Sequence, residues 1–328
     1  MRPFEYASPT TREQALSLLA APGSAPLAGG SDLLALMKDR VETPARLVNL
    51  KGIRDLRGIK VDPKAGLRIG ALVTLDELAG DPALRFEYGA LADAAGRVAG
   101  PQIRNVATVG GNLCQRPRCW YFRNGFGLLA VKDGRSMVVE GDNRYHSIFN
   151  DGSAAPALFV LPSTVVPLLV ALGTQVTILG PRGERQVDLE RFYRVPKAEG
   201  EREHDLAAGE IVAGITVSPV AGRRLASYEV RQRETLDWSL ATASVTLQMD
   251  GPRVAKARVV LGQVAPIPWT ATAAEELLQG KTINSGVAEQ AGEAAVQGAK
   301  PLSRNRYKIQ LARVAVKRAV LAAAGMGV

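Results

Sequence analysis

Residues 25–40 read APLAGGSDLLALMKDR, which is a short apolar run, a Gly-Gly pair and then a helical pattern. Glycine adopts positive φ values readily, and its lack of a Cβ lets another molecule approach the backbone. Ser31 or Asp32 can cap the helix that follows, whose first turn offers unpaired N–H groups that suit a phosphate. A Gly-Gly pair before a capped helix is more often a simple turn, so a turn and a phosphate loop both remain open here.

A second Gly-Gly pair, in TVGGNL at residues 108–113, follows another strand-like run. Two such loops could close on the two charges of a pyrophosphate from either side. Neither loop has the G-x-G-x-x-G spacing of a Rossmann fold or the lysine of a P-loop, which excludes the two usual nucleotide-binding motifs.

The composition indicates a globular protein of two or three domains. The 328 residues are 46% hydrophobic and 22% charged, and no apolar run approaches the roughly 20 residues that a membrane span needs. The N-terminus lacks a signal-peptide pattern, and two cysteines cannot build a disulfide framework, so we expect a cytoplasmic protein. The net charge of +9 is spread along the chain without interleaved aromatic residues, which favours a solvated basic surface or an acidic partner over nucleic acid.

Strands and helices alternate over the first hundred residues, which predicts mixed α/β layers. Thr10-x-x-Glu13 and Thr74-x-x-Glu77 have the spacing of capping boxes at helix starts. Residues 114–155 are polar and weakly periodic, and a loop of about forty residues inside a compact domain is more often functional than not.

The last hundred residues are predicted to form a separate α+β unit that begins near Pro219–Arg223. Two strands meet at Asp250-Gly251, a strong hairpin signal, and three helical stretches follow, near 270–279, 285–298 and 306–323. The last helix has an apolar stripe, and three cations are expected to lie outside it: Lys308, Arg313 and Lys317.

The two cysteines, Cys114 and Cys119, are too few for a structural zinc site or an iron–sulfur cluster. No group of His, Asp and Glu stands beside them, so two ordinary thiols are the simplest interpretation. The arginines at positions 116, 118 and 123 could lower the thiol pKa values and make the thiols reactive.

No catalytic residue is indicated by the sequence. His146 is expected to be a hydrogen-bonded structural side chain, and no G-x-S-x-G, triad or H-E-x-x-H pattern is present. If the protein does chemistry, a bound cofactor is expected to carry it.

Several motifs in order resemble one family along essentially the whole chain. They are MRPFEYASPTTREQALSLL, LAGGSDLLALMK, IRNVATVGGNL, CQRPRCWYFR, GDNRYHSIF and VLGQVAPIPWTATAAEELLQGK. As a set they resemble the FAD-binding medium subunit of the molybdenum hydroxylases, the xanthine dehydrogenase family, nearest the aldehyde oxidoreductase and 4-hydroxybenzoyl-CoA reductase type.

The resemblance implies an α+β fold in two domains. Residues 1–220 would form a two-lobed FAD-binding domain of the vanillyl-alcohol-oxidase type, with lobes of about 1–60 and 61–220 and an inserted loop at 114–155. Residues 221–328 would form a smaller α+β domain, a three-stranded antiparallel sheet plus helices.

The resemblance also implies the residues that bind FAD, non-covalently. The first glycine loop matches the family loop that holds the pyrophosphate, the second matches another FAD loop, and two further positions lie near the cofactor. No catalytic residue and no metal ligand are expected. The implied FAD-binding residues are Leu27, Ala28, Gly29, Gly30, Ser31, Asp32, Leu33, Thr108, Gly110, Gly111, Asn112, Thr164 and Ile211.

Three departures from the family pattern bear on the cofactors. In the nearest branch four cysteines of the inserted loop bind a [4Fe–4S] cluster; Cys119 matches the first, and the others have no counterpart here. We therefore expect no iron–sulfur cluster in this chain. Family members usually have Asp at the position of Thr164 and commonly Lys at that of Glu229, and both changes could weaken or retune flavin binding. The five aromatic and aliphatic residues Trp120, Tyr121, Phe122, Phe126 and Leu128 are expected to bury against the FAD domain and hold the loop.

The function that the resemblance implies is electron transfer within a heterotrimer. A molybdenum-cofactor large subunit would oxidise the substrate, a small [2Fe–2S] subunit would pass electrons on, and FAD in this chain would deliver them to an external acceptor. Arg116 or another loop arginine is a candidate to stabilise negative charge on the reduced ring. A dimer of heterotrimers is compatible with this interpretation, no nucleic acid or membrane span is expected, and two alternatives remain: a flavin-free scaffold subunit and a free-standing flavin oxidase.

Overall fold

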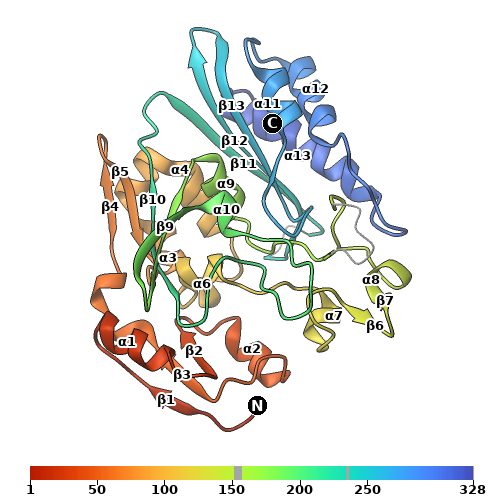
Figure 1. The fold of residues 1–328 in the computed structure, drawn as a ribbon. Helices are drawn as coiled ribbons and strands as arrows, with labels where there is room; N and C mark the ends of the chain where they lie inside the picture. The colour runs from red at the N-terminus through yellow and green to blue at the C-terminus, as the bar shows by residue number, and fades with distance from the viewer. Residues whose placement is uncertain (151–156, 234–235, 328) are drawn as a thin grey trace.

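The computed structural model describes residues 1–150, 157–233 and 236–327, which form three larger sheets with their covering helices and one two-stranded ribbon. Figure 1 shows the N-terminal sheet and the five-stranded sheet on one side, with the C-terminal sheet and helices on the other. Within these residues no helix combines the length and apolar content that crossing a bilayer requires.

The N-terminal lobe is a small parallel sheet with two helices. Strand β3 (Arg46–Asn49) lies between β1 (Glu5–Ala7) and β2 (Ser24–Leu27). The helices are α1 (Arg12–Leu19) and α2 (Leu33–Lys38), and two 3₁₀ turns follow at Leu50–Gly52 and Arg54–Leu56.

The cap of α1 differs from the sequence prediction by one residue. The Thr11 side chain, not that of Thr10, accepts a hydrogen bond from the Gln14 N–H (3.3 Å), and the Gln14 side chain accepts from the Thr10 N–H (3.1 Å). The prediction was wrong here because the Thr-Thr pair offers two registers, and the structure places Gln14 rather than Glu13 at the reciprocal position.

The second lobe is a five-stranded antiparallel sheet whose strands come from distant parts of the chain. Its order is β4 (Ile59–Asp62), β5 (Gly66–Gly70), β10 (Ile211–Val217), β8 (Gln175–Gly180) and β9 (Gly183–Asp188). The helices of this lobe are α3 (Leu75–Gly80), α4 (Pro82–Gly96), α5 (Pro101–Arg104), α6 (Val109–Leu113), α9 (Val166–Ala171) and α10 (Leu189–Phe192). The capping box predicted at Thr74 and Glu77 is confirmed, with both reciprocal hydrogen bonds formed.

The insert that follows α6 is not a featureless loop, contrary to the expectation for residues 114–155. It contains α7 (Trp120–Arg123), a two-stranded ribbon of β6 (Val131–Lys132) and β7 (Arg135–Ser136), and α8 (Met137–Glu140). These elements are too short for hydrophobic periodicity to reveal them. Residues 151–156 of the predicted loop lie outside the described residues.

The C-terminal unit is an antiparallel sheet covered by three helices. Strands β11 (Arg223–Arg231), β12 (Ser239–Asp250) and β13 (Arg253–Gly262) are joined by a short fourth strand, β14 (Trp269–Thr270), where three strands were expected. The Asp250-Gly251 hairpin is confirmed, as are the three helices α11 (Thr272–Leu278), α12 (Ser285–Ala295) and α13 (Tyr307–Ala323).

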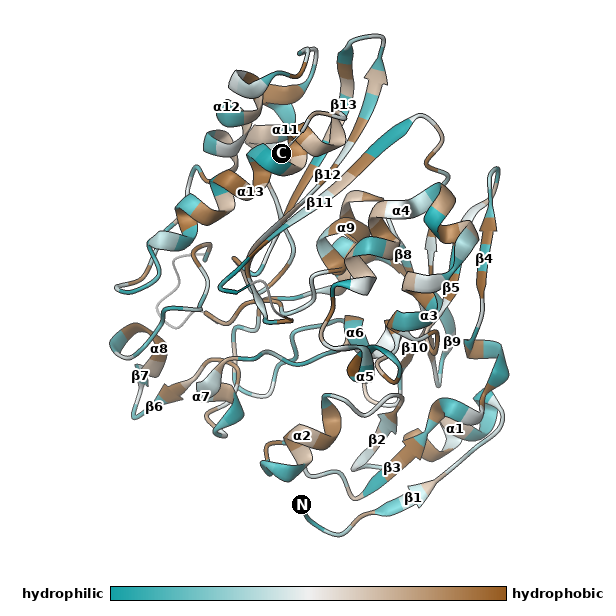
Figure 2. Ribbon diagram, turned by 180° about the vertical axis from the view of Figure 1, so that it is seen from behind, coloured by the Kyte–Doolittle hydropathy of each residue, from teal (hydrophilic) through white to brown (hydrophobic). Residues whose placement is uncertain are grey.

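The C-terminal helix corrects one expectation about charge. Figure 2 shows hydrophobic residues along part of α13 and hydrophilic residues along the rest. Lys308, expected outside the apolar stripe, has only 1% of its surface exposed. The stripe was deduced from helical periodicity alone, which does not register the inserted segment that covers the first turn of α13.

Candidate cofactor-binding site

The first glycine loop, residues 29–32 between β2 and α2, is a row of unpaired backbone donors. No described residue accepts a hydrogen bond from the N–H groups of Gly29, Gly30, Ser31 or Asp32. The chain first closes a turn where the Leu34 N–H bonds to the Gly30 carbonyl at 3.1 Å. Gly30 has a φ of +76°, a backbone conformation that residues other than glycine rarely adopt. Such a concave row of N–H groups suits an anion.

The second glycine loop uses its donors inside the protein. The N–H groups of Val109, Gly110 and Asn112 each bond to a backbone carbonyl at 2.8 Å, and the Gly111 N–H bonds to the Thr108 side chain at 3.1 Å. This loop therefore offers a fixed, bare surface rather than free N–H groups.

The two glycines of the second loop have different surroundings. A Cβ on buried Gly110 would lie 2.8 Å from the Ala71 Cβ, so a side chain there has no room. A Cβ on exposed Gly111 would meet only the Thr108 Oγ1, at 3.1 Å. The outward side of Gly111 is thus open for a ligand to approach the backbone.

The two loops touch one another. A Cβ on Gly29 would lie 1.9 Å from the Val106 carbonyl oxygen and 3.1 Å from the Ala107 Cα, so the two backbones are in direct contact. The Asp32 carboxylate also accepts a hydrogen bond from the Arg116 N–H at 2.7 Å, just beyond the second loop. The structure therefore brings both predicted loops to one place.

Three apolar side chains beside these loops are unusually exposed, and the sequence reasoning did not single them out. They are Leu34, Ile103 and Val106, the last with 47% of its surface exposed. Their aliphatic character resembles that of ordinary core positions, so only the structure distinguishes them. Exposed apolar residues around an open polar loop are typical of a ligand-binding mouth.

Thr164 lies close to the second loop through its neighbour. The Ser163 hydroxyl donates to the Asn112 side-chain oxygen at 2.5 Å, and both residues are buried. The Thr164 Oγ1 is also buried and has no hydrogen-bond partner among the described residues. Because buried hydroxyls normally have partners, this orphaned oxygen fits a site that a polar ligand completes.

The remaining aliphatic positions predicted for the site support the first loop from below. Ile211 in β10 is buried in a cluster against which Ala28 packs. Leu27 is buried in a neighbouring cluster, with Leu33 packed against it. These side chains fix the loop by packing.

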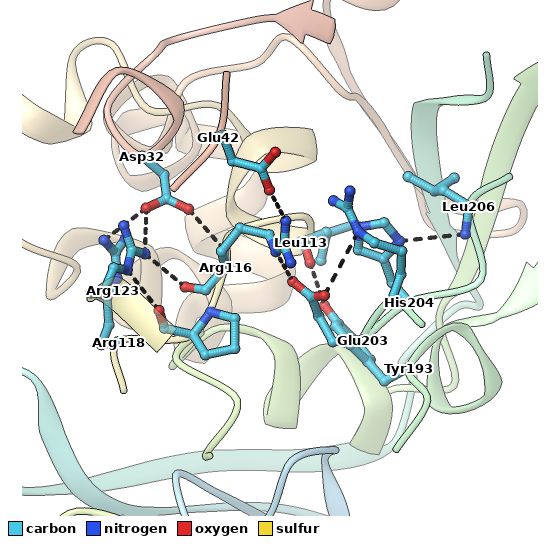
Figure 3. A network of polar contacts seen from close by, with 12 residues as sticks. Asp32, Glu42, Leu113, Arg116, Arg118, Arg123, Tyr193, Glu203, His204 and Leu206 are labelled. Carbon is cyan, nitrogen blue, oxygen red and sulfur yellow. Dashed lines mark hydrogen bonds and ion pairs between the residues drawn. The ribbon is translucent and has the colours of Figure 1, made fainter. Parts of the chain in front are cut away.

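Asp32 does not cap α2, as the sequence allowed, but pairs with two arginines of the insert. Its carboxylate lies 2.8 Å from both Arg118 and Arg123, as Figure 3 shows, and makes no side-chain hydrogen bond to the helix. The carboxylate thereby fastens the near end of the insert to the first glycine loop.

Arg116 has a different set of partners. Its guanidinium pairs with Glu42 in the N-terminal lobe and with buried Glu203, and Arg202 also lies 3.9 Å from Glu203 (Figure 3). The sequence had made Arg116 a candidate for stabilising a reduced ring. With two carboxylates against it, the charge of Arg116 is already matched, and its visible role is to join three segments.

Both cysteines are half-buried, and the pKa values of their thiols move opposite to the prediction. Burial raises the pKa of Cys114 to about 12, against a smaller lowering by Arg202. Burial also raises the pKa of Cys119, whose Sγ lies 3.1 Å from the His146 Nε2. The prediction failed because burial disfavours the charged thiolate more strongly than any nearby positive charge or hydrogen bond favours it.

Lys308 and Asn305 fasten the far end of the insert to the C-terminal unit. The Lys308 Nζ donates to the carbonyl oxygens of Tyr145 (3.3 Å), His146 (3.1 Å) and Gln263 (2.6 Å). The Asn305 amide donates to the His146 carbonyl at 3.1 Å. The far end of the insert is thus held by polar contacts to the C-terminal unit, whereas aromatic burial against the FAD domain was expected to hold the loop.

The aromatic residues proposed for that burial behave unevenly. Phe122 is buried, whereas Phe126 has 37% of its surface exposed and Leu128 is half-buried. Trp120 packs edge-on against the His146 ring and Tyr121 packs against it at a tilt, with centroids 5.4 and 5.8 Å from it. His146 thus packs among aromatic rings of the insert, and its structural role stays a prediction.

No metal centre is visible in the described part of the chain, where no three His, Cys, Asp or Glu side chains gather around one point.

Glu229, which stands where the resemblance implies a lysine, pairs with Arg231 at 2.8 Å and accepts a hydrogen bond from the Ser239 hydroxyl at 2.6 Å. Its charge therefore has a partner within the C-terminal sheet.

Two family descriptions match consecutive parts of the chain. Residues 2–220 match the FAD binding domain in molybdopterin dehydrogenase, and residues 226–323 match the CO dehydrogenase flavoprotein C-terminal domain. The chain belongs to the FAD-binding subunits of the molybdenum hydroxylase family. This confirms the family expected from the motifs and the division into an FAD-binding and a C-terminal flavoprotein domain.

Individual relatives are similar over nearly their whole length. The aldehyde oxidoreductase FAD-binding subunit PaoB of Escherichia coli strain K12 is 34% identical over 95% of this chain and 96% of its own. The carbon monoxide dehydrogenase medium chain of Hydrogenophaga pseudoflava is 28% identical over 98% and 96%.

Solved structures are similar to this chain over nearly its whole length. The chain superposes with a TM-score of 0.76 on the structure of the carbon monoxide dehydrogenase from Hydrogenophaga pseudoflava that lacks the Mo-pyranopterin moiety. The two are 27% identical, and the match covers 98% of this chain and 97% of the other. Quinoline 2-oxidoreductase from Pseudomonas putida 86 gives 0.76 at 26% identity, covering 99% and 98%.

Proposed function

We propose that this chain is the FAD-binding electron-transfer subunit of a heterotrimeric molybdenum hydroxylase. It would take electrons from the [2Fe–2S] clusters of a small subunit and pass them to an external acceptor, while a molybdenum-cofactor large subunit oxidises the substrate. The observation that carries the proposal is the row of unpaired N–H groups at residues 29–32 beside the bare backbone of Gly111. FAD would supply the ability to accept and release electrons, and the protein would bind and orient it.

The structure suggests what each predicted residue would do. The first loop would bind the pyrophosphate through its backbone, Gly111 would allow close approach, and Asn112 and Thr164 would face a polar part of the cofactor. Leu27, Ala28, Leu33 and Ile211 would shape the loop by packing. The orphaned Thr164 hydroxyl supports a retained site at the position where the family usually has Asp.

The finer architecture and the assembly belong to the same proposal. We place the domain boundary near residue 220 and regard the two N-terminal sheets as lobes of the vanillyl-alcohol-oxidase type, divided near residue 60. The partners of this chain would be one large and one small subunit. A dimer of two such heterotrimers is compatible with this proposal. The cytoplasmic location and the absence of an iron–sulfur cluster remain predictions.

The test is the flavin content of the co-expressed complex, measured by visible absorption and by FAD released on denaturation. Gly111→Val should lower the FAD content strongly because a branched side chain would occupy the open side of the loop. Gly89→Ala in α4 is the matched control, since a Cβ there has nothing within 4 Å.

Two outcomes would contradict the proposal. Wild-type complex without flavin would favour the scaffold alternative, and full flavin in Gly111→Val would mean that the loops are misassigned. Gly30→Val is the poorer test, because the positive φ of Gly30 strains any substitution whether or not a ligand binds.

A further inference from the structure

Asp32 poses an electrostatic problem if residues 29–32 hold a pyrophosphate. A carboxylate within a phosphate-binding loop repels the ligand unless its charge is compensated. The structure compensates it twice, because Arg118 and Arg123 both lie 2.8 Å from the carboxylate. One negative and two positive charges leave an excess of one positive charge beside the loop.

The excess charge is specific to this side of the network. Arg116 and Arg202, on the other side, are opposed by Glu42 and Glu203, so two positive charges meet two negative ones there. Figure 3 shows Arg118 and Arg123 together on one side of the Asp32 carboxylate, and Arg116 with Glu42 and Glu203 beside them. Both groups consist of arginines and carboxylates, but only the Asp32 group has more positive than negative charges.

Arg118 is the less satisfied member of that pair. Its Nε is buried and donates to no described acceptor, and the guanidinium has one other weak contact, to the Gln115 side chain at 3.4 Å. Arg123, in contrast, also donates to the Pro117 carbonyl at 2.8 Å and to the Arg116 carbonyl at 3.1 Å. Arg118 therefore retains donor capacity that the protein does not use.

The guanidinium of Arg118 is nevertheless held in place. It lies over the Trp238 ring, 4.5 Å from the centroid, so it is fixed between the first loop and the C-terminal unit. Its side chain is 30% exposed, twice the value for Arg123. A partly exposed, stacked arginine with free donors is preorganised to bind phosphate oxygens.

We propose that Arg118 is an anion-binding residue that contacts the FAD diphosphate beside the first glycine loop, with Asp32 and Trp238 as the residues that position it. This inference rests on the proposed function and adds a side-chain contact to a loop otherwise made of backbone. The Asp32 carboxylate thus serves the site indirectly, by orienting Arg118, while the Asp32 backbone N–H belongs to the row of donors that would bind the pyrophosphate.

The experiment measures binding of oxidised FAD, ADP and riboflavin to flavin-stripped complex carrying Arg118→Gln. Losing one charged hydrogen-bonding group should weaken FAD and ADP binding by about ten- to a hundredfold. Riboflavin, which has no phosphate, should bind as it does to the wild type. Arg118→Lys should restore part of the affinity, because the charge returns without the fork geometry.

The control is Arg135→Gln, which removes a positive charge from the same insert. The Arg135 side chain is 73% exposed and, in the described part of the chain, pairs only with exposed Glu140, so its loss should leave all three affinities unchanged. Equal loss in both variants would mean that only net charge matters and would overturn the proposal. Unchanged FAD affinity in Arg118→Gln with a lowered flavin reduction potential would also overturn it and assign Arg118 to the reduced ring. Failure of the wild type to bind FAD would instead refute the proposed function.

Discussion

Acidification should destabilise this protein through His146, and the size of the effect follows from its surroundings. The imidazole is 2% exposed, its Nδ1 has no partner among the described residues, and burial followed by the nearby Lys308 charge lowers its pKa from 6.5 to about 4. The unfolded chain therefore binds a proton at a pH where the folded chain does not. Stability from this group is complete above pH 6.5 and is lost as the pH falls towards 4.

The magnitude is calculated from the two pKa values. At about pH 5, which is roughly 1.5 units below the pKa of 6.5 in the unfolded chain, the unfolded state binds a proton at His146 and the folded state does not. This difference lowers the free energy of unfolding by about 2 kcal/mol. His204, whose pKa burial lowers to about 3, should add a similar amount independently. Urea denaturation of the same preparation at about pH 7 and about pH 5 measures the combined loss.

The diagnostic variant is His146→Gln, which keeps a polar side chain but cannot titrate. Its loss of stability between the two pH values should be smaller than that of the wild type by about 2 kcal/mol, because the protonation of all other groups cancels in the comparison. His204→Gln is the matched control and should show an equal reduction of its own. If His146→Gln and the wild type lose the same stability on acidification, the buried, neutral imidazole is refuted.

Two further predictions concern the insert. Burial lowers the pKa of Lys308 from 10.5 to about 7, so the unfolded chain binds more protons between these values and wild-type stability should rise with pH there. Lys308→Met should lack this contribution, and equal pH slopes in urea titrations of the two proteins at about pH 7.5 and 9 would contradict the buried amine. Cys119→Ser should leave the iron and flavin content of the separated subunit unchanged, since within the described residues the thiol has a side-chain hydrogen-bond contact to His146 alone. Stoichiometric iron in the wild-type subunit, lost in the variant, would show a cluster that the ligand count missed.

Local signals in the sequence predicted local structure well. The Asp250-Gly251 hairpin and the helices after it depend on turn chemistry and periodicity within a few residues, and the structure has them. The capping box at Thr74 is of the same kind. The register error at Thr10 and Thr11 arose where two local solutions had equal sequence support.

Features that depend on distant segments could not be predicted in this way. Lys308 lies on the polar side of its helix by periodicity, yet it is buried because carbonyl groups from residues 145, 146 and 263 converge on it. The thiol pKa values were mistaken for a related reason, since the sequence shows the nearby arginines but not the burial that raises both pKa values. The residues alone allowed the two glycine loops to meet at one pyrophosphate but could not establish it, because 75 residues of chain separate the loops, and the family resemblance made the meeting an expectation.

The insert can therefore remain ordered without a metal cluster because each end is fastened by a cation from a different source. At its near end the cations belong to the insert itself, Arg118 and Arg123, and the anion is Asp32 of the cofactor loop. At its far end the cation is Lys308 of the C-terminal helix, and its partners are backbone carbonyls of the insert. Backbone carbonyls are present whatever the side chains are, so the far contact tolerates sequence change in the insert, whereas the near contact requires arginine. It follows that substitutions between residues 126 and 140 should affect flavin binding little, whereas a change at Asp32 should affect both the order of the insert and the affinity for FAD.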